Sequence, residues 1–289
     1  MAIVVVCPLG VHTTPGSGGH AWVFLQYVLC LRDLGCEVYW LERTRSTPDP
    51  AEDQRRAATF AHIMDSYGLQ GRTMLYRASE TGGKPEFLNI PASEAESILK
   101  RSDLLLNFEY EIDEYLVGIA QRAALVDIDP GLFQTWLSLG QLQVPNHDIY
   151  FTVGETVGTT SAAFPDCGIR WNRIHPPVHL RSWRYAFDAH SEAFTTVSGW
   201  WGEWLQESEH LSYENSKRVS FLQFVDLPAE VPQRLELALS LPEDPSDVME
   251  IRSALEPKGW RVRSALERGG SASLNTIRFE ISGSAAVNC

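Results

Sequence analysis

Apolar and polar positions over the first forty residues follow the pattern of a strand, a loop, a helix and a second strand. Residues 2–10 form an apolar run typical of a buried strand, and residues 36–42 form another. Between them, residues 21–35 show apolar positions at helical spacing, which indicates one buried helix face. The pattern predicts a β-loop-α-β unit whose loop, residues 11–20, leads directly into the helix.

The alternation of strands and helices continues to about residue 155. Helical patterns are separated by short apolar runs that are bounded by turn-forming residues. Strands that alternate with helices favour a parallel, doubly wound sheet with helices on both faces. The sequence therefore predicts an α/β fold, with helices at 50–68, 91–103 and 111–122 and strands at 73–77, 104–108, 123–129 and 148–155.

The loop before the first helix has little side-chain bulk where that helix begins. Gly16, Gly18 and Gly19 allow a ligand to approach the backbone, and the unpaired N–H groups of a first helical turn favour an anion. His20 comes next, with a side chain that can transfer a proton near neutral pH. The sequence matches neither the dinucleotide fingerprint nor the P-loop pattern. A phosphate site is one interpretation; a tight turn and a histidine without chemistry is the other.

Acidic residues end two other predicted strands of the same sheet. Asp127 and Asp129 end one strand, and Glu155 ends the next. Because the carboxyl ends of parallel strands share one edge, we expect these residues to converge with His20 on one site. Asp129 stands before Pro-Gly, which is also typical of a turn or a helix cap. Asp127 is expected to be partly buried, and Glu155 is equally compatible with a solvated loop.

Composition and charge narrow the expected partners and location. The chain has 289 residues, of which 44% are hydrophobic, and this supplies a sizeable core. The net charge of −13 predicts no nucleic-acid partner, because counterion release needs a basic surface. The N-terminus does not resemble a signal peptide, and no apolar run approaches the ~18 residues of a membrane span. Five cysteines without a CxxC pair favour free thiols and a cytoplasmic location.

A segment rich in Pro, Trp and His separates the α/β part from the C-terminal part of the chain. His175 and His179 are four residues apart, but Pro176 and Pro177 between them prevent a shared helical face, so no metal site is predicted. Residues 193–201 resume as a strand and lead into WWGEW, whose tryptophans favour a core or an interface, with an aromatic platform for sugars as an alternative. We therefore expect a domain boundary in this segment.

Several blocks of the chain together resemble bacterial two-domain glycosyltransferases of the GT-B fold. The resemblance covers about residues 1–262 and is carried by GGHAWVFLQYVLCLRDLGCEVYWLE (18–42), LVDIDPGLFQTW (125–136), DIYFTVGETVG (148–158), CGIRWNRIHPPVHL (167–180) and ENSKRVSFLQFVDLP (214–228). It implies two Rossmann-like units with parallel sheets, an acceptor-side domain at 1–185 and a donor-side domain at 186–262. The implied reaction moves a sugar from a nucleotide-sugar to an acceptor hydroxyl, without a metal or a further cofactor.

The resemblance also implies roles for the residues at the sheet edge. The glycine loop would face the donor's diphosphate, and His20 would take the proton of the acceptor hydroxyl. Catalysis is accordingly assigned to His20 and Asp129, and the binding of substrate or donor to Gly16, Gly18, Gly19, Asp127 and Glu155. The donor, the acceptor and the oligomeric state cannot be inferred from the sequence.

The last residues depart from this resemblance. Residues 263–289 are small, polar and non-periodic, which favours a poorly ordered tail produced by a frameshift or truncation near residue 265. The donor-side unit would then be incomplete, and the sequence leaves open whether the chain is active in transfer. Two alternatives stay open: a non-catalytic protein that binds a ligand or partner, and a nicotinamide-dependent oxidoreductase. The latter needs an acidic residue at the end of the second strand, which Glu42 supplies, and a GxGxxG loop, which is missing.

Overall fold

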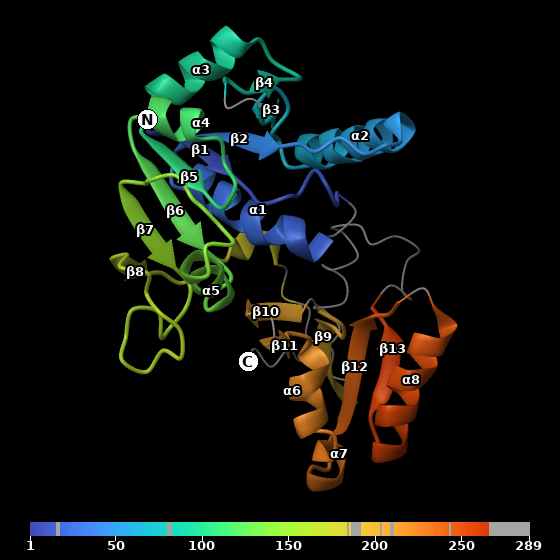
Figure 1. Ribbon diagram of the computed structural model, residues 1–289. Helices are drawn as coiled ribbons and strands as arrows, with labels where there is room; N and C mark the ends of the chain where they lie inside the picture. The colour runs from blue at the N-terminus through green and yellow to red at the C-terminus, as the bar shows by residue number, and fades with distance from the viewer. Residues whose placement is uncertain are drawn as a thin grey trace. The chain divides into compact units, whose positions relative to one another are not determined.

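The protein consists of two compact units, Met1–His179 and Leu180–Cys289 (Figure 1). The structure is a computed structural model and describes residues 1–15, 18–79, 83–183, 185, 192–202, 204–208, 211–242 and 244–265. The domain boundary expected after residue 185 stays a prediction, since Arg184 and residues 186–191 lie outside the described residues.

The first unit is built on an eight-stranded sheet with the order β4-β3-β2-β1-β5-β6-β7-β8. All neighbouring strands are parallel except β3 and β4, which are antiparallel. The order reverses between β1 and β5, as in doubly wound folds. The expected α/β architecture with a parallel sheet is confirmed; the strands are β1 (Ile3–Cys7), β2 (Glu37–Arg43), β3 (Thr73–Arg77), β4 (Glu86–Phe87), β5 (Leu104–Asn107), β6 (Ala123–Asp127), β7 (Ile149–Thr152) and β8 (Trp171–Arg173).

Helices cover both faces of this sheet (Figure 1). Leu99 of α3 and Leu116 of α4 pack with Val5 and Leu105 on one face. On the other face, the ring of Trp40 contacts the ring of Phe60 of α2, with centroids 6.2 Å apart. Burial on both faces explains why the strands are apolar almost throughout. The helices are α1 (Gly18–Asp33), α2 (Pro50–Ser66), α3 (Ala92–Arg101), α4 (Glu114–Ile119) and α5 (Leu132–Ser138).

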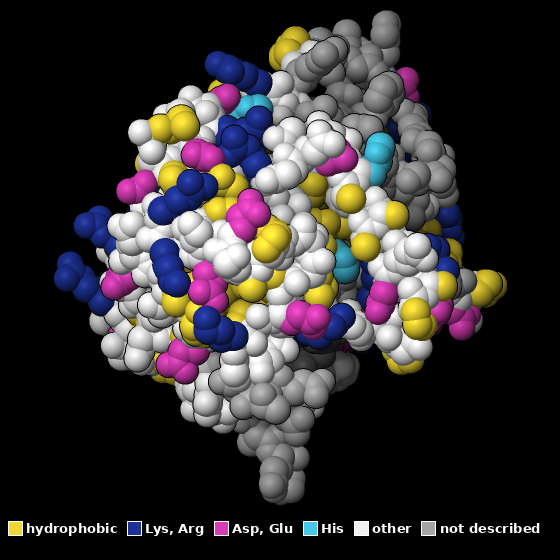
Figure 2. All heavy atoms as spheres, turned by 90° about the horizontal axis from the view of Figure 1, so that it is seen from above, with side chains coloured by type: hydrophobic (Ala, Val, Ile, Leu, Met, Phe, Trp, Pro, Cys, Tyr) yellow, Lys and Arg dark blue, Asp and Glu magenta, His cyan; other side chains and the backbone are white. Residues whose placement is uncertain are grey.

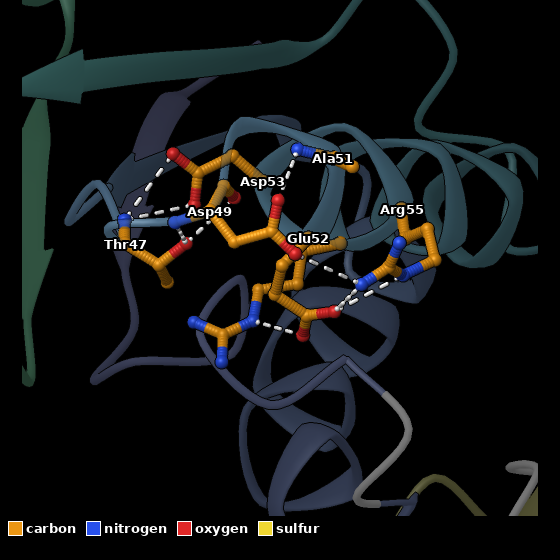
Figure 3. Close-up of polar contacts among 7 residues, drawn as sticks. Thr47, Asp49, Ala51, Glu52, Asp53 and Arg55 are labelled. Atoms are coloured by element: carbon orange, nitrogen blue, oxygen red, sulfur yellow. Dashed lines mark hydrogen bonds and ion pairs between the residues drawn. The ribbon is translucent and has the colours of Figure 1, made fainter.

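Specific residues explain where α1 ends and where α2 begins. After α1 the chain turns at Gly35, whose φ of 84° is left-handed, and the N–H of Cys36 donates to the carbonyl of Leu31 at 3.0 Å. The N-terminus of α2 is capped by Asp49, which accepts from the N–H of Ala51 at 2.9 Å (Figure 3). Asp53 reaches back to the N–H of Thr47 at 2.9 Å, so carboxylates of the protein itself occupy this helix end (Figure 3).

The second unit contains a smaller parallel sheet with the order β13-β12-β9. Its core includes Trp200, Leu237 and Ile251, and the ring of Trp200 stacks on Phe221. Trp201 is 41% exposed, with the guanidinium of Arg218 over its ring. The strands are β9 (Ala193–Gly199), β10 (Trp204–Ser208), β11 (Leu211–Glu214), β12 (Arg234–Ser240) and β13 (Arg261–Ser264), and the helical elements are η1 (Leu180–Ser182), α6 (Lys217–Gln223), α7 (Leu227–Glu230), α8 (Pro245–Leu255) and η2 (Glu256–Lys258).

The expected tail lies almost entirely outside the described residues. Arg263 and Ser264, its first two residues, belong to β13. Residues 266–289, which make up nearly all of that tail, are not described. Within the described part of the chain, no helix has the length and apolar character needed to cross a membrane.

Candidate functional site

The carboxyl edge of the large sheet holds most of the residues that the sequence singled out. In open α/β sheets, ligands bind outside the carboxyl ends of the strands, where the strand order reverses. That point lies between β1 and β5 in this sheet. The connection from β1 to α1 leaves this edge, as do the segments after β5, β6 and β7.

His20 lies in the first turn of α1 and is half-buried. Its Nε2 is 2.5 Å from the carbonyl oxygen of Leu9. A carbonyl oxygen only accepts hydrogen bonds, so Nε2 carries the hydrogen and the neutral ring keeps its lone pair on Nδ1. The ring meets Phe24, one turn further along α1, edge to face. The arrangement makes Nδ1 the ring atom able to accept a proton.

The start of α1 is built from glycines rather than from residues with charged side chains. Gly18 and Gly19 are the first two residues of the helix, and its first turn contains no acidic residue. The first turn of α2, in contrast, contains Glu52 and Asp53. Positive charge at a helix N-terminus attracts anions, and nearby carboxylates oppose this. The start of α1 is therefore the better suited of the two for an anion; Gly16 lies outside the described residues.

Asp127 ends β6 and is fully buried. Its Oδ2 accepts from Gln134 Nε2 at 2.8 Å and from Thr152 Oγ1 at 2.9 Å, and its Oδ1 accepts from the N–H of Asp129 at 2.9 Å. Burial raises the pKa of Asp127, while these three hydrogen bonds oppose the shift. Both carboxylate oxygens are thus engaged within the protein, and Asp127 joins β6 to α5 and to β7. Its assignment to substrate or donor binding stays a prediction.

Asp129 is half-buried, and its Oδ2 accepts from the hydroxyl of Tyr110 at 3.2 Å. It is not the N-cap of α5, because that position belongs to Gly131, whose N–H donates to Gln134 Oε1 at 2.6 Å. Leu9, which accepts the His20 hydrogen bond, packs against the cluster that contains Tyr110. His20, through Leu9, and Asp129, through Tyr110, are thus both linked to one small apolar cluster.

Glu155 is exposed and forms an ion pair with Arg173 of β8. The loop that carries it packs closely on the loop after Asp129. A Cβ at Gly154 would lie 2.5 Å from the Cβ of Pro130, a distance that real atoms do not tolerate. The loops after β6 and β7 are thus in contact, while the partner of the Glu155 carboxylate is Arg173 rather than His20 or Asp129. The assignment of Glu155 to donor binding also stays a prediction.

Two further buried carboxylates lie at this edge, and sequence reasoning did not assign them to the site. Glu42, at the end of β2, is fully buried, and Glu109, after β5, is 2% exposed. Burial raises the pKa of Glu42 to about 8 and also raises the pKa of Glu109. The guanidinium of Arg43 lies 3.7 Å from Glu109. The signal that could have found them is an acidic residue at the end of each of two apolar runs.

Glu42 also bears on the oxidoreductase alternative. Its two oxygens accept from the N–H of His12 at 2.9 Å and from the indole N–H of Trp40 at 2.8 Å. Such a side chain cannot reach the ribose of a dinucleotide, which was the role that this alternative required. Glu42, the one sequence feature that favoured a nicotinamide cofactor, therefore binds groups of the protein itself. Within the described ranges, no three His, Cys, Asp or Glu side chains gather into a group that could hold a metal ion.

Comparison with known proteins gives a match at the level of structure. No family model and no curated protein matches the sequence. A solved structure of an α-glucosyltransferase in complex with UDP and a 13-mer DNA with a central A:G mismatch matches 98% of this chain and 70% of that chain, at 10% identity and a TM-score of 0.51. The fold is like that of an α-glucosyltransferase. An α-glucosyltransferase in complex with UDP matches 100% of this chain and 74% of its own length, at 12% identity and a TM-score of 0.49.

This similarity confirms the expected fold class. A large parallel sheet and a second, smaller parallel sheet form a GT-B-like architecture. At 10% identity the likeness is one of fold, so it does not establish the activity, the substrate or the site residues.

The expectation that nucleic acid is excluded as a partner is wrong. A protein of similar fold is found in complex with DNA as well as UDP. The expectation rested on the net charge of −13 for the whole chain. Salt screens charges beyond about 10 Å, so a sum over the whole chain does not describe the field at a local surface. Figure 2 shows Lys and Arg side chains beside Asp and Glu side chains over the face in view, rather than an evenly acidic surface.

Proposed function

We propose that the chain binds the nucleoside diphosphate of a nucleotide-sugar and transfers the sugar to an acceptor hydroxyl. The observation that carries the proposal is the start of α1: Gly18 and Gly19 open a helix N-terminus without carboxylates, directly beside His20. It is supported by a fold similar to that of an α-glucosyltransferase in complex with UDP. We also propose that the protein is related to bacterial GT-B glycosyltransferases and acts in the cytoplasm.

In this proposal the first unit supplies a proton acceptor and a positive helix end. Nδ1 of His20 takes the proton of the acceptor hydroxyl, while Nε2 keeps its hydrogen bond to Leu9. The first N–H groups of α1 stabilise the negative charge of the departing diphosphate. Asp129, which accepts from Tyr110 of the same apolar cluster, provides a second polar group to orient the acceptor.

The test is UDP binding by isothermal titration calorimetry with the full chain and a substitution in the first turn of α1. Gly19→Asp places a carboxylate among the N–H groups that would meet the diphosphate. We expect UDP to bind the wild-type chain and the Gly19→Asp chain to bind it about tenfold more weakly, which corresponds to about 1.4 kcal/mol.

The matched control is Gly118→Asp, which places the same side chain on an exposed helical glycine of α4. A Cβ at Gly118 meets no atom within 4 Å, so this substitution should leave UDP binding unchanged. Absence of UDP binding to the wild-type chain, or equal weakening by both variants, would refute the proposal. Binding of UDP without release of UDP from any UDP-sugar would instead favour a non-catalytic binding protein.

A further inference from the structure

The connection from β1 to α1 contains a tight turn that buries part of its own backbone. Gly10 takes a left-handed φ of 64°, and the N–H of Thr13 donates to its carbonyl at 3.2 Å. Val11 and His12 are buried, and the ring of His12 packs edge-on against Phe60 of α2. Buried backbone N–H groups in a loop need an acceptor, because no strand or helix supplies one.

Glu42 supplies that acceptor from the end of β2. Its Oε1 accepts from the N–H of His12 at 2.9 Å, and the backbone of Val11 also donates to it. Its Oε2 is taken by the indole N–H of Trp40 at 2.8 Å. None of the ion pairs among the described residues includes Glu42. The Glu42 side chain is therefore held by neutral donors, and it organises the turn.

The same turn carries the hydrogen-bond acceptor of His20. Leu9 directly precedes Gly10, and its carbonyl oxygen accepts from His20 Nε2. Glu42 and His20 thus hold the turn from two sides, one through its N–H groups and the other through a carbonyl oxygen. A shift of the turn would move the Leu9 carbonyl and remove the reason for the His20 hydrogen to reside on Nε2.

We propose that Glu42 is a positioning residue for His20. By holding the N–H groups of Val11 and His12, it sets the place of the Leu9 carbonyl, which keeps His20 in the Nε2–H form with Nδ1 as the proton acceptor. The catalytic meaning of this tautomer rests on the proposed function, but the tautomer itself exists without any ligand.

Other charged and titratable groups surround this arrangement. Glu109, after β5, and the buried thiol of Cys7, on β1, interact electrostatically with Glu42. From α2, Asp53 and Arg56 act on the turn through the ring of His12. The pKa of Glu42, raised by burial to about 8, makes its ionisation observable in the intact protein.

The test is nuclear magnetic resonance of the full chain with ¹⁵N-labelled histidine, which reports the tautomer of each ring. In the wild-type chain we expect His20 to be mainly in the Nε2–H form. Glu42→Gln puts an amide N–H₂ group against either the indole of Trp40 or the N–H of His12, and in the second orientation the turn loses its acceptor. His20 should then move toward a mixture of tautomers.

Two further variants separate positioning from a general structural effect. Glu37, at the other end of β2, accepts hydrogen bonds from Tyr39 and Arg72. Glu37→Gln should therefore leave the His20 signals unchanged. In the double variant Trp40→Phe with Glu42→Gln, the indole N–H is gone and the glutamine oxygen is free to accept from His12. His20 should return to its wild-type tautomer.

A folded Glu42→Gln chain with wild-type His20 signals would overturn the proposal. If that variant does not fold, a measurement on the wild-type chain tests the proposal. A wild-type His20 mainly in the Nδ1–H form would contradict the proposal, because the Leu9 carbonyl would then not hold the hydrogen on Nε2. Because the readout needs no ligand, failure of UDP binding would count against the proposed function alone.

Discussion

Replacement of Asp127 by alanine should destabilise the first unit. The carboxylate accepts three hydrogen bonds, from the Gln134 side chain, the Thr152 hydroxyl and the N–H of Asp129. A buried donor left without a partner costs about 1–3 kcal/mol. Gln134 is fully buried and loses its acceptor completely.

The Thr152 hydroxyl and the N–H of Asp129 can find other hydrogen-bond partners, which limits the expected loss of stability. Thr152 also accepts from the N–H of Gly154 at 3.0 Å, and its hydroxyl can rotate. Asp129 is half-buried, so its N–H can bind water. We therefore expect Asp127→Ala to lower the free energy of unfolding by about 3 kcal/mol. For a unit of this size, this corresponds to a fall in Tm of about 6–12 °C.

Differential scanning calorimetry of the full chain measures this, with Glu155→Ala as the matched control. Glu155 also stands after a strand of this edge, but its pair with Arg173 is exposed, and exposed pairs contribute about 0–1 kcal/mol. The control should therefore leave the transition of the first unit nearly unchanged. A loss of less than about 1 kcal/mol for Asp127→Ala would refute the reasoning, because the three donors would then have found other partners.

Two further predictions concern the same edge. Gly154→Ala should destabilise the chain by about 1–3 kcal/mol in urea unfolding, because its Cβ would lie 2.5 Å from Pro130 and 2.6 Å from Val157; Gly118→Ala, in open space on a helix, should be neutral or stabilising. In the folded chain, burial raises the pKa of Glu42 to about 8, whereas an unfolded glutamate has a pKa of about 4.3. Between these values the folded chain holds a proton that the unfolded chain has lost, so the free energy of unfolding should fall as the pH rises from about 4.3 to about 8. Urea unfolding between pH 5 and 8 should show a weaker pH dependence in Glu42→Gln, and an unchanged slope would contradict the burial argument.

The strands buried on both faces of the large sheet could be predicted from the sequence. The run IVVVC in β1 is apolar throughout, and β6 is apolar up to its last residue, Asp127, because helices cover both sides of the sheet. β4 and β8 could not be predicted in the same way. β4 has two residues and pairs antiparallel with β3, and β8 has three residues at the other edge of the sheet, with polar Asn172 and Arg173. Such short edge strands are determined by pairing rather than by their own sequence.

The edge that holds the candidate site was also predictable, but the partners of its side chains were not. Strand ends are visible in the sequence, so His20, Asp129 and Glu155 could be assigned to one edge. Asp127 shows the same signal as Asp129, two residues away, and yet one carboxylate is buried with three donors and the other is half-exposed. The difference arises from Gln134 and Thr152, which reach Asp127 from other elements. No local pattern encodes such contacts.

Glu42 shows most clearly how a correct local interpretation leads to the wrong chemistry. An acidic residue at the end of the second strand is the position that contacts a ribose in dinucleotide-binding proteins. That contact requires the carboxylate to face the ligand. Here the connection from β1 to α1 folds over the strand end, and the N–H of His12, thirty residues away in sequence, takes the oxygen that a ribose would need. A ligand at the end of β2 would therefore meet the loop that Glu42 holds rather than Glu42 itself.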